Sequence, residues 1–202
     1  MCYFRQISHV HFFCGTSMKR FLIISGLGVV ILILMGSIVL FFYKRHTKSF
    51  SPEEEVTFES RDLKIKVIYN RPNKKGRVIF GGLVPYDEVW RTGANEATTF
   101  SSNLPLKIQG KTLNAGKYSL WTIPRENQWS IIFNDEIGQW GINTSGEANR
   151  IPSRDVLSVD VTAMIQDREI EQFTISFEAI GEEAEMVLMW DKTVVALPFS
   201  YP

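Results

Sequence analysis

Residues 51–202 contain neither histidine nor cysteine. All three histidines of the chain and both of its cysteines lie in the first 50 residues. Residues 51–202 therefore cannot form a Ser-His-Asp triad, a Cys-His dyad, a disulfide or a Cys/His zinc site. Catalysis there would have to use carboxylates, Lys, Arg, Tyr, Ser/Thr or an oxygen-ligated metal. We expect no cofactor and assign no metal site.

Acidic side chains are absent from the first 50 residues. Six of the 22 Lys/Arg lie there, so residues 51–202 combine the other sixteen with all 22 Asp/Glu and carry a net charge of −6. This asymmetry indicates two physical environments for the two parts. An acidic body argues against nucleic-acid partners, which require clustered Lys and Arg.

An uncharged apolar stretch, residues 21–43, is flanked by Lys19-Arg20 and Lys44-Arg45. Its length matches a transmembrane helix across a hydrocarbon core of about 30 Å. One alternative is a buried core helix. The other is a cleaved signal, whose apolar core is usually about 7–15 residues and ends at a small-residue cleavage site. The stretch has no such site, so the sequence favours an uncleaved anchor that contacts the lipid bilayer through residues 21–43.

Residues 1–20 form a short basic tail before the apolar stretch. Met18, immediately followed by Lys19-Arg20, resembles a translation start, and we hypothesise that it is the true initiator. Basic residues flank both ends of the stretch, so the positive-inside rule does not set the orientation. A basic leader before an apolar run is typical of an export signal. We therefore predict a single-pass inner-membrane protein with its N-terminus inside and its body extracytoplasmic, in the periplasm.

The rest of the chain divides into a polar tether, residues 44–60, expected to be irregular, and a β-rich domain, residues 61–202. Apolar residues alternate with a period of two in several segments of that domain, as in half-buried strands. Turn signals such as Asp191-Lys192 separate the segments. Two short windows, 135–140 and 161–166, are the best helix candidates. The strand segments are 63–69, 129–133, 157–161, 173–177, 186–190 and 193–197.

About eight or nine strands over this length predict an all-β fold. The expected architecture is an antiparallel β-sandwich or a jelly-roll-like domain, preceded by one N-terminal transmembrane helix. One segment, Phe80 to Thr99, resists the strand pattern and contains Trp90-Arg91-Thr92-Gly93-Ala94-Asn95-Glu96. A long loop in a compact domain is usually functional.

Three blocks carry a family resemblance: RPNKKGRVIFGGLVPYDEVWRTGANEATTF, AGKYSLWTIP and WSIIFNDEIGQWG. From about Leu63 to Pro198 the chain resembles the bacterial domain-of-unknown-function family 2911. The resemblance implies an envelope-associated β-rich protein and no specific reaction. The membrane anchor departs from the family's cleaved signal.

Candidate ligand-binding side chains lie in and around these blocks, and each has a structural alternative. Arg91 has the donor geometry to bind an anionic or hydroxylated ligand, or it bridges to Glu96, Asp87 or Glu88. Asn95 and Glu96 orient a ligand, with Glu96 a possible general base, or they serve turn geometry. Arg71 and Arg77 form a basic lip or are exposed hairpin charges.

Trp90 and Trp140, the latter preceded by Gln139, lie beside glycines in loops. An indole face there serves as a platform for sugar rings or aromatics, or it plugs the core. The other three tryptophans, in strand patterns, are predicted to be core. A group of glycines is predicted to satisfy backbone geometry: Gly81, Gly82, Gly93, Gly138 and Gly141.

Three functions remain open. The favoured one is a membrane-anchored extracytoplasmic binding or scaffolding module of the cell envelope, whose partner is a glycan, a small molecule or an envelope protein. The alternative is a glycan-directed hydrolase using Glu96 with Asp87 or Glu88, because two carboxylates about 5–9.5 Å apart suffice for glycoside cleavage. The third is a purely structural role, in which the loop only pins the domain.

Overall fold

The computed structural model describes residues 14–202, so the first thirteen residues of the predicted basic tail lie outside the described residues. The described chain forms two compact units, one ending at His46 and the other running from Thr47 to Pro202. The elements, in chain order, are α1 (Cys14–Phe50), β1 (Glu53–Ser60), β2 (Leu63–Asn70), β3 (Thr98–Ser102), β4 (Leu106–Ile108), β5 (Lys111–Leu113), β6 (Gly116–Ile123), β7 (Gln128–Asn134), η1 (Pro152–Arg154), β8 (Asp155–Ile180) and β9 (Glu183–Phe199).

Helix α1 is long and apolar enough to cross a membrane, which suggests a single-pass anchor. Its apolar side chains are exposed along the whole of the stretch predicted to span the bilayer. The hydroxyls of Ser25 and Ser37 donate hydrogen bonds to the carbonyls of Leu22 and Ile33, at 3.1 and 2.8 Å. These two polar side chains are therefore satisfied within the helix, as a hydrocarbon environment requires.

Residues 44–60 differ from the irregular tether that the sequence suggested. The helix continues to Phe50, and strand β1 begins at Glu53. Residues 44–51 contain no glycine or proline that would end the helix earlier, and Pro52 then disfavours a helical conformation at the residue before it. Lys48 then donates to the Glu53 carboxylate at 2.7 Å across the junction.

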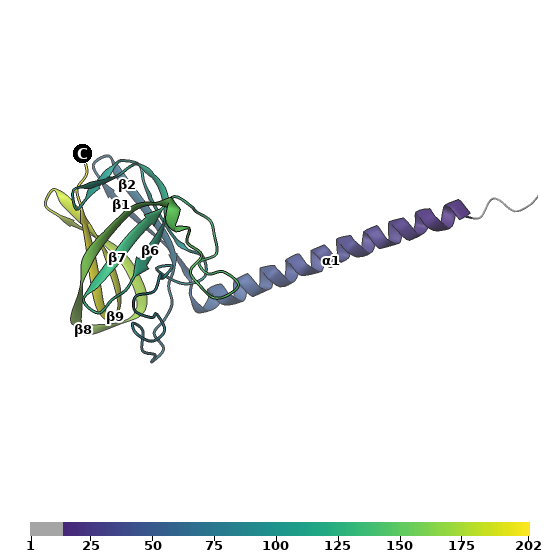
Figure 1. Cartoon of the computed structure of the whole chain (residues 1–202), viewed down its shortest axis with the longest axis horizontal. Helices are drawn as coiled ribbons and strands as arrows, with labels where there is room; N and C mark the ends of the chain where they lie inside the picture. Colours follow the sequence, from purple (N-terminus) through teal and green to yellow (C-terminus); the bar gives the residue numbers. More distant parts are fainter. Residues whose placement is uncertain (1–13) are drawn as a thin grey trace, which may run out of the picture. The chain divides into compact units, whose positions relative to one another are not determined.

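Seven strands form one antiparallel sheet in the order β1-β2-β3-β6-β7-β8-β9, which confirms the predicted antiparallel β class. The sheet curls so that its first and last strands meet: the ring of Phe58 in β1 stacks on Phe177 in β8 at 5.5 Å and meets Phe199 in β9 edge-on at 6.4 Å. Figure 1 shows the curled sheet with β6, β7 and β8 side by side. Of the two short helix candidates, 161–166 lies within β8 and 135–140 forms no helix.

The core fills the inside of this curled sheet. Alternate residues of β2 are buried, and Trp121, Trp129 and Trp190 are core residues, as predicted. The hydroxyl of Tyr69 in β2 accepts a hydrogen bond from the backbone N–H of Ile175 in β8 at 2.9 Å, and burial raises the pKa of this tyrosine. A buried hydrogen bond thus joins two strands that are not neighbours in the sheet.

Candidate functional site

Residues 71–97 connect β2 to β3 across one end of the sheet, with isolated bridges in place of regular strands. Trp90 is fixed to β6 by two backbone hydrogen bonds with Thr122, at 2.7 and 3.0 Å. The buried Thr92 is held by its neighbours, because its carbonyl accepts a hydrogen bond from the Thr98 hydroxyl at 2.7 Å. The loop that the sequence singled out is therefore rigidly attached to the core.

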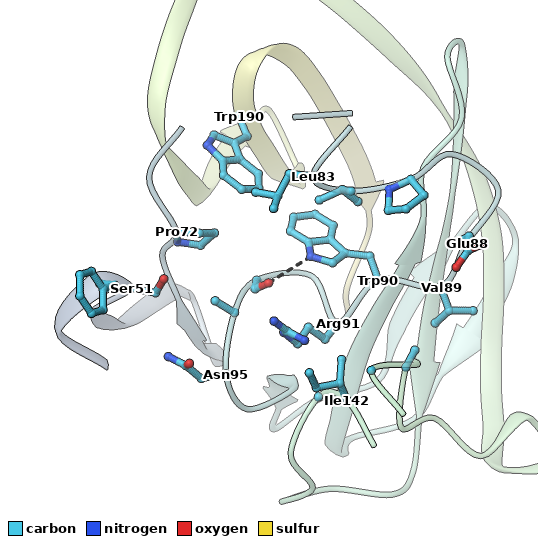
Figure 2. Close-up of a pocket in the computed structure, with 18 of the residues that line it drawn as sticks. Ser51, Pro72, Leu83, Glu88, Val89, Trp90, Arg91, Asn95, Ile142 and Trp190 are labelled. Atoms are coloured by element: carbon cyan, nitrogen blue, oxygen red, sulfur yellow. Dashed lines mark hydrogen bonds between the residues drawn. The ribbon is translucent and has the colours of Figure 1, made fainter. Parts of the chain in front are cut away.

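A cavity of about 710 Å³ opens beside this loop. Figure 2 shows Trp90 and Arg91 near its centre, with Trp190 and Leu83 on one side and Ile142 on the other. The volume lies within the range of about 300–1,000 Å³ typical of sites for small organic ligands. The walls come from four separate parts of the chain: residues 47–51, 72–95, 141–148 and Trp190.

Trp90 is largely a core residue with an edge on the cavity. Its side chain is 9% exposed, and its ring stacks on Trp190 with centroids 5.9 Å apart. Phe80, Trp129 and Phe173 pack against it edge-on. The indole N–H donates to the Gly93 carbonyl at 3.0 Å, so the ring cannot rotate without breaking a buried hydrogen bond.

Arg91 lines the cavity without a carboxylate partner among residues 14–202. Its Nε is buried and makes no hydrogen bond to a described residue, and burial lowers the pKa of the guanidinium. Its aliphatic stem lies against Gly141, where a Cβ atom would come within 2.1 Å of the Arg91 Cδ. Only glycine at position 141 leaves room for this arginine conformation. A partly desolvated cation of this kind is suited to an anionic ligand.

The acids considered as partners of Arg91 are engaged elsewhere or exposed. Glu96 accepts from the Asn70 amide at 3.2 Å and lies 3.4 Å from Lys48 Nζ. Asp87 pairs with Arg125 at 2.8 Å. Glu88 lies on the cavity wall and is exposed. Neither Glu96 nor Asp87 lines the cavity, so the carboxylate pair of the hydrolase hypothesis does not face this cavity.

The other candidates divide between the cavity and its surroundings. Asn95 lines the cavity, is 9% exposed and has a φ of 58°. Arg77 also lines it, while donating to the carbonyls of Lys74 and Asn73 at 3.0 and 2.6 Å. Arg71 is outside the lining. It donates to the Phe173 carbonyl at 3.0 Å and the Thr174 hydroxyl at 2.9 Å, so it ties β2 to β8.

Gln139 and Trp140 are also outside the cavity lining. The Gln139 amide donates to the Glu136 carbonyl at 3.2 Å, and Trp140 forms an isolated β-bridge with Glu96. These residues hold the 139–142 segment against the Asn95–Ala97 backbone: the Gly141 N–H donates to the Asn95 carbonyl at 3.0 Å. They therefore position the part of the loop that packs on Arg91.

Several lining residues were not anticipated from the sequence. Lys75 lies in the segment Pro-Asn-Lys-Lys-Gly between Arg71 and Arg77, and the basic character of that segment was a signal for it. Ile142, Glu147 and Ala148 carry no pattern that would have placed them here. Trp190 was expected in the core, and it does lie there, with one face toward the cavity.

No curated protein matches the chain. No solved structure matches it either. A family model described as "Protein of unknown function (DUF2911)" matches residues 51–199, so it includes strand β1, which the resemblance from about Leu63 left out. The match covers more than half of the chain, and the protein therefore belongs to the DUF2911 family.

Proposed function

We propose that this protein is a membrane-anchored binding module of the cell envelope. Residues 21–43 cross the inner membrane, the body lies on the extracytoplasmic side, and the cavity beside Arg91 holds a small ligand. The observation that carries the binding role is the partly buried Arg91 without a carboxylate partner among the described residues, in a cavity of about 710 Å³. A desolvated guanidinium is costly unless an anion offsets the cost.

Binding is tested with benzoate, a small aromatic carboxylate, and with benzamide, its uncharged analogue. We expect benzoate to stabilise the full-length protein in lipid nanodiscs, by about 2.7 kcal/mol at 100 times its Kd, and benzamide to have a much weaker effect. Arg91→Met keeps an unbranched apolar stem but removes the charge, so it should abolish the benzoate effect. Thermal unfolding measures the ligand effects in the wild type and in Arg91→Met. Equal stabilisation of wild type and Arg91→Met would contradict the proposal.

A matched control is Arg154→Met. Arg154 pairs with Asp135 at 2.6 Å and does not line the cavity. This substitution also removes one surface-accessible positive charge from the body, so it corrects for nonspecific attraction of benzoate. The Arg154→Met protein should respond to benzoate as the wild type does.

Orientation is tested by cysteine labelling, for which the cysteine-free body is convenient. Cys2 and Cys14 are replaced by serine, and Glu182→Cys introduces a thiol at a turn where the side chain is 91% exposed. We expect a membrane-impermeant maleimide to label this thiol in spheroplasts before lysis. Lys19→Cys, on the other side of the span, should react only after lysis. The reverse pattern would place the body in the cytoplasm.

A further inference from the structure

The cationic side chains of the cavity differ in depth. Lys75 and Arg77 are exposed, so solvent screens their charges. Arg91 is partly buried, and its Nε is completely shielded from solvent. Two carboxylates, Glu88 and Glu147, also line the cavity and would repel a highly charged anion. This balance fits a ligand with a single negative group bound at Arg91.

The wall around Arg91 is mixed: polar side chains such as Ser51, Asn73 and Asn95 alternate with a group of apolar ones. Pro72, Val84, Trp90 and Trp190 are buried residues that contribute to the lining. In Figure 2 Leu83, Val89 and Ile142 complete the apolar surroundings. Because these apolar side chains offer no hydrogen bonds, the part of a ligand that lies against them would be apolar.

The rim of the cavity combines exposed apolar and basic side chains. Val78 is 71% exposed and Leu83 44%, and the two are adjacent because the Leu83 N–H donates to the Val78 carbonyl at 3.0 Å. Phe50 is 52% exposed and has Lys75 Nζ 5.1 Å from its ring centroid. Exposed apolar residues next to Lys and Arg are characteristic of surfaces that lie at the bilayer interface.

One part of the cavity wall follows the proposed span closely along the chain. Thr47 lines the cavity and follows Tyr43, the last residue of the proposed span, by four positions. Four residues reach at most about 14 Å even when fully extended. The cavity lining thus begins within one short chain segment of the membrane, whatever the angle between the two units.

From these observations we infer that the ligand is a membrane-resident amphiphile with one negative head group on an apolar body, bound by its head group at Arg91 and admitted from the bilayer past Val78 and Leu83. This inference rests on the proposed function and names its ligand class. The source of the ligand is the membrane. The test below distinguishes a ligand from this source from a water-soluble monoanion.

The experiment uses full-length protein in phosphatidylcholine nanodiscs, with 12-bromododecanoate as the probe at a pH at which it is ionised. Bromine quenches the fluorescence of Trp90 and Trp190, which both line the cavity. We expect half-maximal quenching at a probe concentration at least about tenfold lower for the wild type than for Arg91→Met. Arg91→Lys should recover part of the difference, and Arg154→Met should behave as the wild type. With 12-bromododecanol, which is uncharged, the wild type and Arg91→Met should be equal.

Two further arms test the source of the ligand. The soluble 3-bromopropionate should quench much less than 12-bromododecanoate at equal total concentration. Val78→Glu, outside the cavity lining, should weaken quenching by the long-chain probe and leave benzoate binding unchanged. If 3-bromopropionate is as effective as the long-chain acid, or if Val78→Glu has no effect, the membrane source is wrong while the binding function stands. If neither benzoate nor any bromo acid distinguishes the wild type from Arg91→Met, both proposals fail.

Discussion

Replacing Trp90 by alanine is expected to lower the free energy of unfolding by about 3–5 kcal/mol, the usual cost of truncating a buried tryptophan. The indole packs against four aromatic rings and lies at the centre of the aromatic cluster below the cavity. Its removal also leaves the Gly93 carbonyl without its 3.0 Å hydrogen bond. Urea unfolding of the full-length protein, followed by the circular dichroism of the β-rich body, measures the loss.

Trp140→Ala is the matched control for this prediction. Trp140 is only partly buried and takes no part in the aromatic cluster around Trp90. Its truncation should cost markedly less than that of Trp90. Equal losses for the two variants would mean that the cluster around Trp90 does not contribute the expected packing energy.

Gly93→Ala is expected to cost about 2–5 kcal/mol, the sum of backbone strain and a steric collision. Gly93 has a φ of 154°, at which a side chain is strained. A Cβ atom there would lie 2.9 Å from the Asn70 carbonyl oxygen and 3.2 Å from the Thr98 hydroxyl. The carbonyl is fixed at the end of β2, so it cannot move away cheaply. The same unfolding assay measures the change.

Gly138→Ala separates the two contributions. Gly138 has a φ of 85°, but no heavy atom lies within 4 Å of the added Cβ. This variant therefore carries the conformational cost alone, about 1–2 kcal/mol. If Gly93→Ala were no more destabilising than Gly138→Ala, the close approach of Asn70 would not be a constraint on the loop.

Local patterns were sufficient to predict the fold class, because alternation of period two survives in most strands. They failed at strand boundaries. Asp191-Lys192 looked like a turn between two strands, but it lies inside β9, where Asp191 has a φ of 54° and the pairing with β8 is irregular. A bulge and a turn use the same residue types, and only the partner strand distinguishes them.

The candidate site was predicted only in part, because local sequence groups the residues of one loop but does not show which loops dock together. Trp90, Arg91 and Asn95 share one loop, so proximity in sequence was enough to group them, and all three line the cavity. Glu96 is next in sequence, yet its carboxylate lies outside the lining and contacts Asn70 and Lys48. Ile142 and Glu147 reach the cavity only through the docking of a second loop, which no local pattern encodes.

The last turn of α1 determines what a cut in the chain near Phe50 would do to the cavity. Thr47 and Phe50 belong to the helix, yet they form part of the cavity wall, and Lys48 pairs with both Glu53 and Glu96. A protease that cut the chain after Phe50 would release a body with one wall of its cavity missing. A cut before Thr47, by contrast, would leave every lining residue on the released body, so the two cuts differ by only a few positions in the chain but give different sites.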